Sequence, residues 1–203
     1  MRTGILFVVS GPAGSGKGTV VKQLVEKYND VKLSVSATTR APRQGEVNGR
    51  EYFFITKEEF EKRIANGEML EYNHFTGNGN YYGTPKKEVE EALNEGNDII
   101  LEIEVNGGMN VKKQFPNAVT IMLTPPNGEE LERRLIERNT ESPEEIKKRL
   151  ETAQRELEYL SSYDYAVVNE TNKSWECAEL IYTIIRAERQ KTIYTKSIRN
   201  LFK

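Results

Sequence analysis

Three glycines and a lysine near the start of the chain have the spacing of a loop that binds phosphate. Gly11, Gly14 and Gly16 allow the backbone to turn tightly and to direct its N–H groups inward. Lys17 follows with a full positive charge, and the N-terminus of the next helix adds a partial one. The residues that we assign to this loop, and hence to a polyphosphate, are Gly11, Pro12, Ala13, Gly14, Ser15, Gly16, Lys17, Gly18 and Thr19.

The segments on either side support this assignment. Residues 4–9 are continuously apolar, as in a buried parallel strand, and residues 20–28 carry apolar side chains at helical spacing. The position after the lysine usually holds Ser or Thr, whose hydroxyl binds Mg²⁺, but here it is Gly18 and the hydroxyl comes at Thr19. We therefore take Thr19 as a candidate metal ligand. The alternative is a glycine-rich turn that binds nothing, and the order of strand, loop and helix argues against it.

Two arginines on a predicted loop form a second candidate anion site. Arg40 and Arg43 flank Pro42, which breaks regular structure. Planar guanidiniums bind a phosphate dianion through two parallel hydrogen bonds, which a lysine cannot do as well. Tyr52 and Tyr82 can add neutral hydroxyl donors. The alternatives are solvated loop charges for the arginines and ordinary packing for the tyrosines.

Two carboxylates lie near the end of a predicted strand. Residues 98–105 read as one buried strand, in which Glu102 and Glu104 would point to the same face at the C-terminal end. Ligand sites of doubly wound sheets lie at that end. Because a buried strand rarely carries two unpaired acids, we expect the pair to act in a site; the alternative is solvated charges at an edge.

The remaining pattern alternates strands with helices. Short strands are expected at 32–36, 51–55, 68–75, 118–123 and 165–169. Thr56 and Ser142 would cap helices, the latter with Pro143 in the first turn. Thr84 would cap a helix over 85–95, and Gly107 would open another short helix. Further helices are expected over 128–138 and from 174 onward.

Composition indicates one globular unit. The chain has 203 residues with 29 basic and 31 acidic side chains and a net charge of −2, so no bulk attraction to nucleic acid or to an anionic membrane is expected. The single Cys177 excludes an internal disulfide, and the single His74 leaves no cluster for zinc. No apolar run suits a signal peptide or the roughly 20 residues of a membrane span, so we expect a cytoplasmic protein without nucleic-acid or membrane partners.

Three further segments, together with the phosphate loop, carry a specific resemblance. Residues 36–43 read Ser-Ala-Thr-Thr-Arg-Ala-Pro-Arg, residues 45–54 contain Gly-Glu-Val-Asn-Gly followed by Tyr-Phe-Phe, and residues 81–84 read Tyr-Tyr-Gly-Thr. The chain resembles the guanylate kinases, of the nucleoside monophosphate kinase family, over nearly its whole length to about Ala187. This resemblance implies a three-layer α/β/α P-loop fold with a central parallel sheet. The core would be 1–34, 85–125 and 161–203, with a small mixed GMP-binding insert at 35–84 and a helical lid at 126–160.

The resemblance also implies roles for single residues. Positions that match GMP contacts are Ser36, Arg40, Arg43, Tyr52, Glu71, Tyr82, Thr84 and Glu104, and positions that match catalytic residues are Lys17, Arg40, Arg134, Arg138 and Arg149. Asn169 matches a position near the adenine of ATP, and Glu102 a position that meets Mg²⁺ through water. Many relatives have aspartates at 102 and 104, so which glutamate faces the metal and which faces guanine stays open.

Guanine chemistry fits a carboxylate at position 71. Guanine offers N–H donors at N1 and N2, whereas adenine presents an acceptor at N1 that would leave the carboxylate unpaired, at a cost of about 1–3 kcal/mol or more. The alternative is a solvated strand glutamate. For the lid arginines the alternative is a charged surface helix, which we expect for Arg133 and Arg155.

The implied reaction is ATP plus GMP giving ADP plus GDP, with Mg²⁺ on the donor and dGMP as a second acceptor. ATP and GMP would be the partners, and whether the chain forms a homodimer stays open. Two alternatives are a guanylate kinase-like module that binds protein without catalysis, and a kinase for another nucleoside monophosphate. Turnover of ATP with GMP, compared with other monophosphates, separates these functions.

Overall fold

The computed structural model describes residues 3–75, 79–137 and 142–194. Its strands are β1 (Leu6–Ser10), β2 (Val31–Leu33), β3 (Ala37–Thr38), β4 (Phe53–Phe54), β5 (Met69–Phe75), β6 (Asn80–Pro85), β7 (Asp98–Glu102), β8 (Val119–Thr124) and β9 (Tyr165–Val168). Its helices are α1 (Lys17–Lys27), α2 (Lys57–Ala65), α3 (Lys86–Asn94), α4 (Val105–Gln114), α5 (Gly128–Glu137), α6 (Pro143–Leu157), η1 (Leu160–Ser162) and α7 (Ser174–Glu188). No helix in the described part of the chain is long and apolar enough to cross a membrane.

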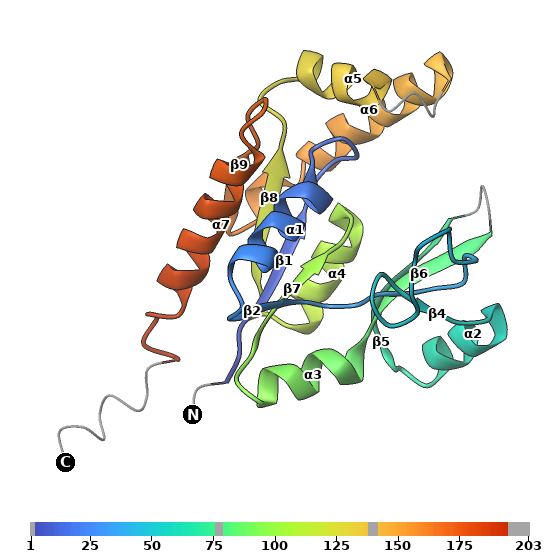
Figure 1. The fold of residues 1–203 in the computed structure, drawn as a ribbon, viewed down its shortest axis with the longest axis vertical. Helices are drawn as coiled ribbons and strands as arrows, with labels where there is room; N and C mark the ends of the chain where they lie inside the picture. The colour runs from blue at the N-terminus through green and yellow to red at the C-terminus, as the bar shows by residue number, and fades with distance from the viewer. Residues whose placement is uncertain (1–2, 76–78, 138–141, 195–203) are drawn as a thin grey trace.

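A five-stranded parallel sheet forms the centre, in the order β2-β7-β1-β8-β9. The residues of β1 are buried on both faces. Phe7 and Val9 pack in one cluster with α1 and α7, and Leu6 and Val8 pack in another with α3 and α4. Alternate side chains of the strand therefore serve opposite layers, and the predicted three-layer α/β/α fold with a parallel sheet is confirmed (Figure 1).

A second, smaller sheet has the order β4-β3-β6-β5 and is mixed. β3 runs parallel to β4, whereas β6 runs antiparallel to both β3 and β5. Phe60 of α2 packs against Ala37 and Met69 in a separate small core. In Figure 1 this sheet and α2 lie to one side of the central sheet.

Helices α5 and α6 form the third part of the molecule, at the top of Figure 1. Leu131 and Leu135 of α5 pack against Ala153 of α6 in a cluster of their own. The Ser142 hydroxyl accepts a hydrogen bond from the Glu145 amide, and the Glu145 carboxylate accepts one from the Ser142 amide, so the predicted capping box is confirmed. The turn between the helices, 138–141, lies outside the described residues.

Three local predictions were wrong. The strand predicted at 98–105 ends at Glu102, because the chain turns into α4 with Glu104 as its N-cap. Helix α4 begins at Val105 rather than at Gly107, and the helical glycines are explained by close packing: a Cβ at Gly107 would lie 2.9 Å from the Glu71 carboxylate. Thr84 does not cap α3, whose N-cap is Pro85; Thr84 belongs to β6.

A charge network joins the start of β1 to the end of α7. Asp98, 1% exposed, accepts a hydrogen bond from the Ile5 amide at 2.8 Å and one from Arg189 Nε at 2.6 Å. Arg189 also pairs with the more exposed Asp30. One buried carboxylate therefore ties together segments about ninety residues apart on either side.

We predict that Asp98→Ala lowers the free energy of unfolding by about 3 kcal/mol, because it removes the buried partner of Arg189 and leaves the Ile5 amide without its acceptor. Urea denaturation followed by circular dichroism measures this. The matched control is Asp30→Ala, which removes the more exposed partner of the same arginine and should cost at most about 1 kcal/mol. Equal effects of the two substitutions would contradict the role of burial.

Candidate active site

The phosphate loop lies between the end of β1 and the start of α1, as predicted. Gly14 and Gly16 have φ of 91° and 92°, in the left-handed region that favours glycine. A Cβ at Gly11 would lie 2.0 Å from the Leu123 carbonyl oxygen, and one at Gly16 would lie 2.4 Å from Asn169 Nδ2. The loop is therefore pressed against the ends of β8 and β9, and neither position tolerates a side chain.

Lys17 is folded back over this loop. Its ammonium donates to the carbonyl oxygens of Gly11 at 2.6 Å and Pro12 at 3.2 Å. The same side chain borders a cavity of about 840 Å³. Among the residues that line this cavity are Gly11, Ala13, Lys17, Ser36, Tyr52, Glu71, Asn73, Tyr82, Glu102, Glu104, Asn106, Asn110, Lys148, Arg149, Thr152 and Glu156. The loop, the small sheet, the β7–α4 connection and α6 all contribute, so this first cavity joins all three parts of the molecule.

Glu71 is the most deeply buried acid of the first cavity, at 8% exposed. Burial raises the pKa of its carboxyl to about 7, and the hydrogen bond from the Thr84 hydroxyl, 2.8 Å long, opposes that shift. The glycine at 107 leaves room for the carboxylate next to the first turn of α4. Ser36 lines the same cavity, whereas Thr84, itself fully buried, acts on it through Glu71.

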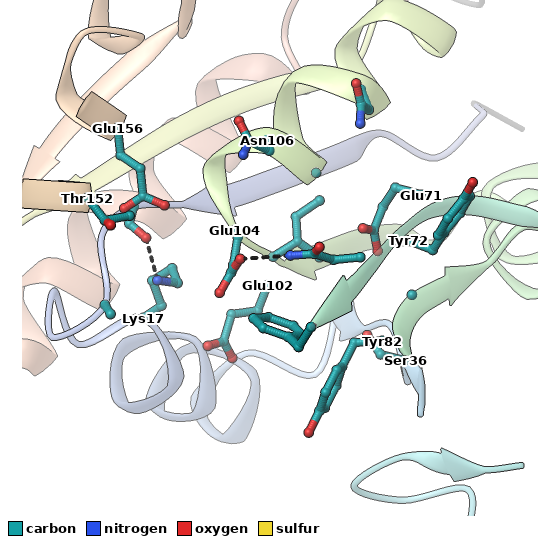
Figure 2. A pocket seen from close by; sticks show the side chains of 18 of the residues that line it. Lys17, Ser36, Glu71, Tyr72, Tyr82, Glu102, Glu104, Asn106, Thr152 and Glu156 are labelled. Carbon is teal, nitrogen blue, oxygen red and sulfur yellow. Dashed lines mark hydrogen bonds between the residues drawn. The ribbon is translucent and has the colours of Figure 1, made fainter. Parts of the chain in front are cut away.

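Three more carboxylates come from three different elements. Figure 2 shows Glu102, Glu104 and Glu156 on the side of the cavity near Lys17, while Glu71 lies on the far side beside the small sheet. Burial raises the pKa of Glu102, and Lys17 opposes this shift. Burial, and next the negative charge of Glu104, raise the pKa of Glu156. Although the strand assignment of residue 104 was wrong, Glu102 and Glu104 do face the same cavity.

The loop that carries Arg40 and Arg43 lies next to the first cavity without lining it. Tyr52 and Tyr82 line it with their rings 6.0 Å apart, and Arg40 Cζ lies 5.5 Å from the centre of the Tyr52 ring. Burial raises the pKa of the Tyr52 hydroxyl. Arg40 and Arg43 are not among the lining residues, and the Arg40 guanidinium is paired with Glu46. The structure thus brings the two tyrosines to the cavity and places Arg40 directly behind them.

A second cavity of about 360 Å³ lies on the other side of the loop. Its lining includes Gly14, Gly16, Thr19, Glu130, Arg133, Arg134, Asn169 and Asn172. Arg134 donates to the Asn169 carbonyl oxygen at 2.8 Å and to Glu130 at 2.7 Å, and Asn169 Nδ2 donates to the Ser15 carbonyl oxygen at 2.8 Å. Asn169 Oδ1 is buried and accepts no hydrogen bond from the described residues. Thr19 lines this cavity and not the one that holds Glu102.

The lid arginines separate between the two cavities. Arg134 lines the second and Arg149 the first, and Arg138 lies outside the described residues. Arg133 pairs with Glu130 and Glu137 on α5 but also lines the second cavity, whereas Arg155 donates within its own helix, as expected of a surface charge. Arg134 and Arg149 therefore face different cavities.

Sequence reasoning missed several lining residues. Lys148, Thr152 and Glu156 follow one another at intervals of four on α6, a spacing that places them on one helix face and that could have revealed them. Asn73 is two residues after Glu71 on β5, and its amide donates to Glu104 at 3.2 Å. Asn106 and Asn110 come from α4 and had no signal of their own, because the start of that helix was misplaced.

Comparison with known proteins gives concordant matches. The family model described as guanylate kinase matches residues 3–184. A guanylate kinase of Clostridium perfringens (strain SM101 / Type A) is 48% identical over 92% of this chain and 84% of its own length. A guanylate kinase of Desulfitobacterium hafniense (strain Y51) is 53% identical over 82% of each chain. The crystal structure of guanylate kinase from Anaplasma phagocytophilum is similar with a TM-score of 0.76 and 34% identity, covering 96% of this chain and 90% of that one.

A more distant structural match concerns the fold alone. A shikimate kinase from Acinetobacter baumannii superposes with a TM-score of 0.52 at 15% identity, covering 94% of this chain and 97% of that one.

We predict that carboxyl ¹³C NMR detects one glutamate that titrates near pH 7, and that Glu71→Gln removes this signal. Thr84→Val should raise the same pKa further, because the hydroxyl stabilises the charged form. A titration in which every glutamate has a pKa near the ordinary value of about 4.3 would contradict the burial of Glu71.

Proposed function

The chain belongs to the guanylate kinase family and is an ATP:GMP phosphotransferase, and from this premise we propose how its residues divide the work. GMP is bound in the first cavity, and ATP reaches across the phosphate loop from the second. The observation that carries this proposal is a buried carboxylate, Glu71, fixed by Thr84 at one end of a cavity whose other end is Lys17.

Glu71 reads the base. A charged carboxylate accepts hydrogen bonds from N1–H and N2–H of guanine, and the pKa of about 7 places its charge change in the physiological range. Ser36 lines the same region, and Glu104, held by Asn73, supplies a second acceptor. AMP offers an acceptor at N1 and would leave the buried carboxylate unpaired, so the site discriminates against it.

Arg40 and Arg43 bind the acceptor phosphate, with hydroxyl donors from Tyr52 and Tyr82. The tyrosines reach the cavity, and the Arg40 guanidinium lies against the Tyr52 ring. A planar cation with two parallel N–H groups suits a phosphate dianion. These contacts would hold the attacking oxygen in line with the transferred group.

The donor lies along the loop. Its phosphates accept hydrogen bonds from main-chain N–H groups of the phosphate loop, and its adenine lies near Asn169, which lines the second cavity. On binding, the Lys17 ammonium exchanges the carbonyl oxygens of Gly11 and Pro12 for phosphate oxygens. Arg134 and Arg149 stabilise charge from the lid. The role of Arg138 stays a prediction, since it lies outside the described residues.

Mg²⁺ fits this donor set with the nucleotide as its main ligand. In the described part of the chain no three His, Cys, Asp or Glu residues are grouped to hold a metal ion by themselves. Mg²⁺ keeps several waters and binds one or two carboxylates plus phosphates, and Glu102 is a half-buried carboxylate beside Lys17. The ion would neutralise phosphate charge, and Glu102 would hold its waters. Thr19 faces the other cavity and is assigned to the donor side.

The reaction needs no general base, because the phosphate of GMP is already ionised. Transfer depends on positioning and on charge stabilisation. We assign residues 35–84 to an acceptor-binding insert and 126–160 to a lid, around a core of 1–34, 85–125 and 161–203. Closure of both would exclude water from the transferred group. We further propose a cytoplasmic location and dGMP as a second acceptor.

We predict that the KM for GMP rises about tenfold between pH 8 and pH 6, because Glu71, with a pKa of about 7, becomes protonated and loses an acceptor. Steady-state kinetics at saturating ATP measures this. The Glu71→Gln variant should lose this pH dependence and its preference for GMP over AMP. Any effect of the ionisation of the GMP phosphate itself remains in both the unmodified protein and the variant. Identical pH profiles for the two proteins would contradict the assignment.

We predict that Lys17→Ala lowers kcat for ATP and GMP by about 10²-fold or more, since it removes a cation from the transferred group. Lys22→Ala, an exposed lysine of the same helix, is the matched control and should keep full turnover. Thermal unfolding shows whether each variant is folded. Near-normal turnover of folded Lys17→Ala would overturn the proposed donor site.

A further inference from the structure

The guanidinium of Arg40 is used on one edge and available on another. The Glu46 carboxylate accepts from Nη1 and Nη2 at 2.9 Å each, and the Ala41 carbonyl oxygen accepts from Nη1 at 2.7 Å. These bonds take three of the five N–H groups of the side chain. Among the described residues no carboxylate or carbonyl oxygen accepts from the Nε–H or the second N–H of Nη2, which lie parallel along one edge of the plane and match two oxygens of a phosphate; the Tyr82 hydroxyl, itself a proposed phosphate donor, is the further contact of the guanidinium.

The same carboxylate also holds the second arginine. Glu46 accepts from the Arg43 amide at 2.7 Å, and the Glu46 amide donates to the Arg43 carbonyl oxygen at 3.1 Å. The Arg43 side chain is exposed. Glu46 thus closes the loop 40–46 on itself and sets where the Arg43 side chain leaves the backbone.

Aromatic rings fix the plane of Arg40. Its Cζ lies 5.5 Å from the centre of the Tyr52 ring and 5.7 Å from that of Phe54. The side chains of Arg40 and Glu46 are only 15% and 17% exposed, so the ion pair is largely shielded from water. The hydrogen bonds with Glu46, and less so the Tyr82 hydroxyl, raise the pKa of Arg40. The guanidinium is therefore held in one orientation before any ligand arrives.

We propose that Glu46 is a positioning residue for the phosphate of GMP: it holds the end of the Arg40 guanidinium and the Arg43 backbone so that the free edge of Arg40 faces the phosphate. This inference rests on the proposed role of Arg40. Glu46 does not touch the substrate; it lowers the entropy lost when the arginine binds.

The opposite role would be competition, with Glu46 standing where the phosphate must bind. Two observations argue against it. Glu46 uses the end of the guanidinium and leaves the edge with Nε free, and its bond to the Arg43 amide keeps it within the turn. The two roles predict effects of opposite sign, because removing a competitor would tighten GMP binding.

The test compares Glu46→Gln with Glu51→Gln. Glu51 lies in the same segment and likewise accepts from a main-chain amide, of Val47, and from an arginine, Arg50, but neither contact reaches Arg40. We expect Glu46→Gln to raise the KM for GMP about tenfold or more, because a charge-assisted pair is lost. The KM for ATP and the inhibition constant of guanosine, which has no phosphate, should stay within about twofold, and Glu51→Gln should change none of the three.

A double-mutant cycle with Arg40→Ala separates this inference from the function that it rests on. If Arg40→Ala leaves the KM for GMP unchanged, the proposed phosphate site itself fails. If Arg40→Ala raises the KM for GMP but Glu46→Gln leaves it unchanged, and Glu46→Gln keeps its unfolding temperature, only the positioning role fails. The expected result is that Glu46→Gln has a much smaller effect on the KM for GMP once Arg40 is alanine, because only its bond to the Arg43 amide is then left to lose.

Three other results would overturn the proposal. The first is a lower KM for GMP in Glu46→Gln, and the second is an equal loss of affinity for GMP and for guanosine in that variant. The third is a rise in the KM for GMP in Glu51→Gln as large as the rise in Glu46→Gln. If Glu46→Gln does not fold, Glu46→Asp replaces it. Its shorter carboxylate keeps the charge but cannot span the same distance, so the same selective rise in the KM for GMP is expected. An unchanged KM for GMP in this variant would contradict the proposal.

Discussion

The contact of the glycine loop with the ends of β8 and β9 is the constraint on which the site depends. A Cβ at Gly11 would meet the Leu123 carbonyl oxygen at 2.0 Å, and one at Gly16 would meet the Asn169 amide at 2.4 Å. Because the loop cannot move outward without losing this packing, its N–H groups stay turned toward a ligand. Lys17 follows the loop and lines the first cavity, while Gly14 and Gly16 line the second, so the two cavities share this fixed loop.

This enzyme transfers a phosphoryl group between two anionic substrates, yet four glutamates line its first cavity, and their environments differ. Glu71 is buried and bonded to Thr84, Glu104 is bonded to Asn73, and Glu102 is influenced by Lys17. Carboxylates accept hydrogen bonds from guanine and from metal-bound water, but they repel phosphate. The phosphates therefore have to meet beside the cations, which come from Lys17, Arg40 and the arginines of α5 and α6. The acids have to lie beside the base and the metal-bound waters.

Local patterns predicted much of the fold and part of the site. The phosphate loop and the Ser142 capping box were readable because their residues are close in sequence, and the buried strands were readable because a strand covered on both faces is continuously apolar. The strand predicted at 98–105 was too long, because the alternation of apolar and acidic residues continues through Glu104 although α4 begins directly after it. Thr84 has the sequence of a helix cap, yet its hydroxyl is used by Glu71 across the sheet.

The sequence by itself determined the chemistry that is available: a phosphate loop, two arginines in a turn, paired acids and a capped helical lid. Only the tertiary structure decided which of these groups meet. Thr19 and Glu102 face different cavities, Glu46 takes one side of Arg40, and Asn73 reaches Glu104 thirty-one residues away. The physical reason is that burial and pairing depend on distances in space, and these are set by the packing of sheets and helices distant in the chain.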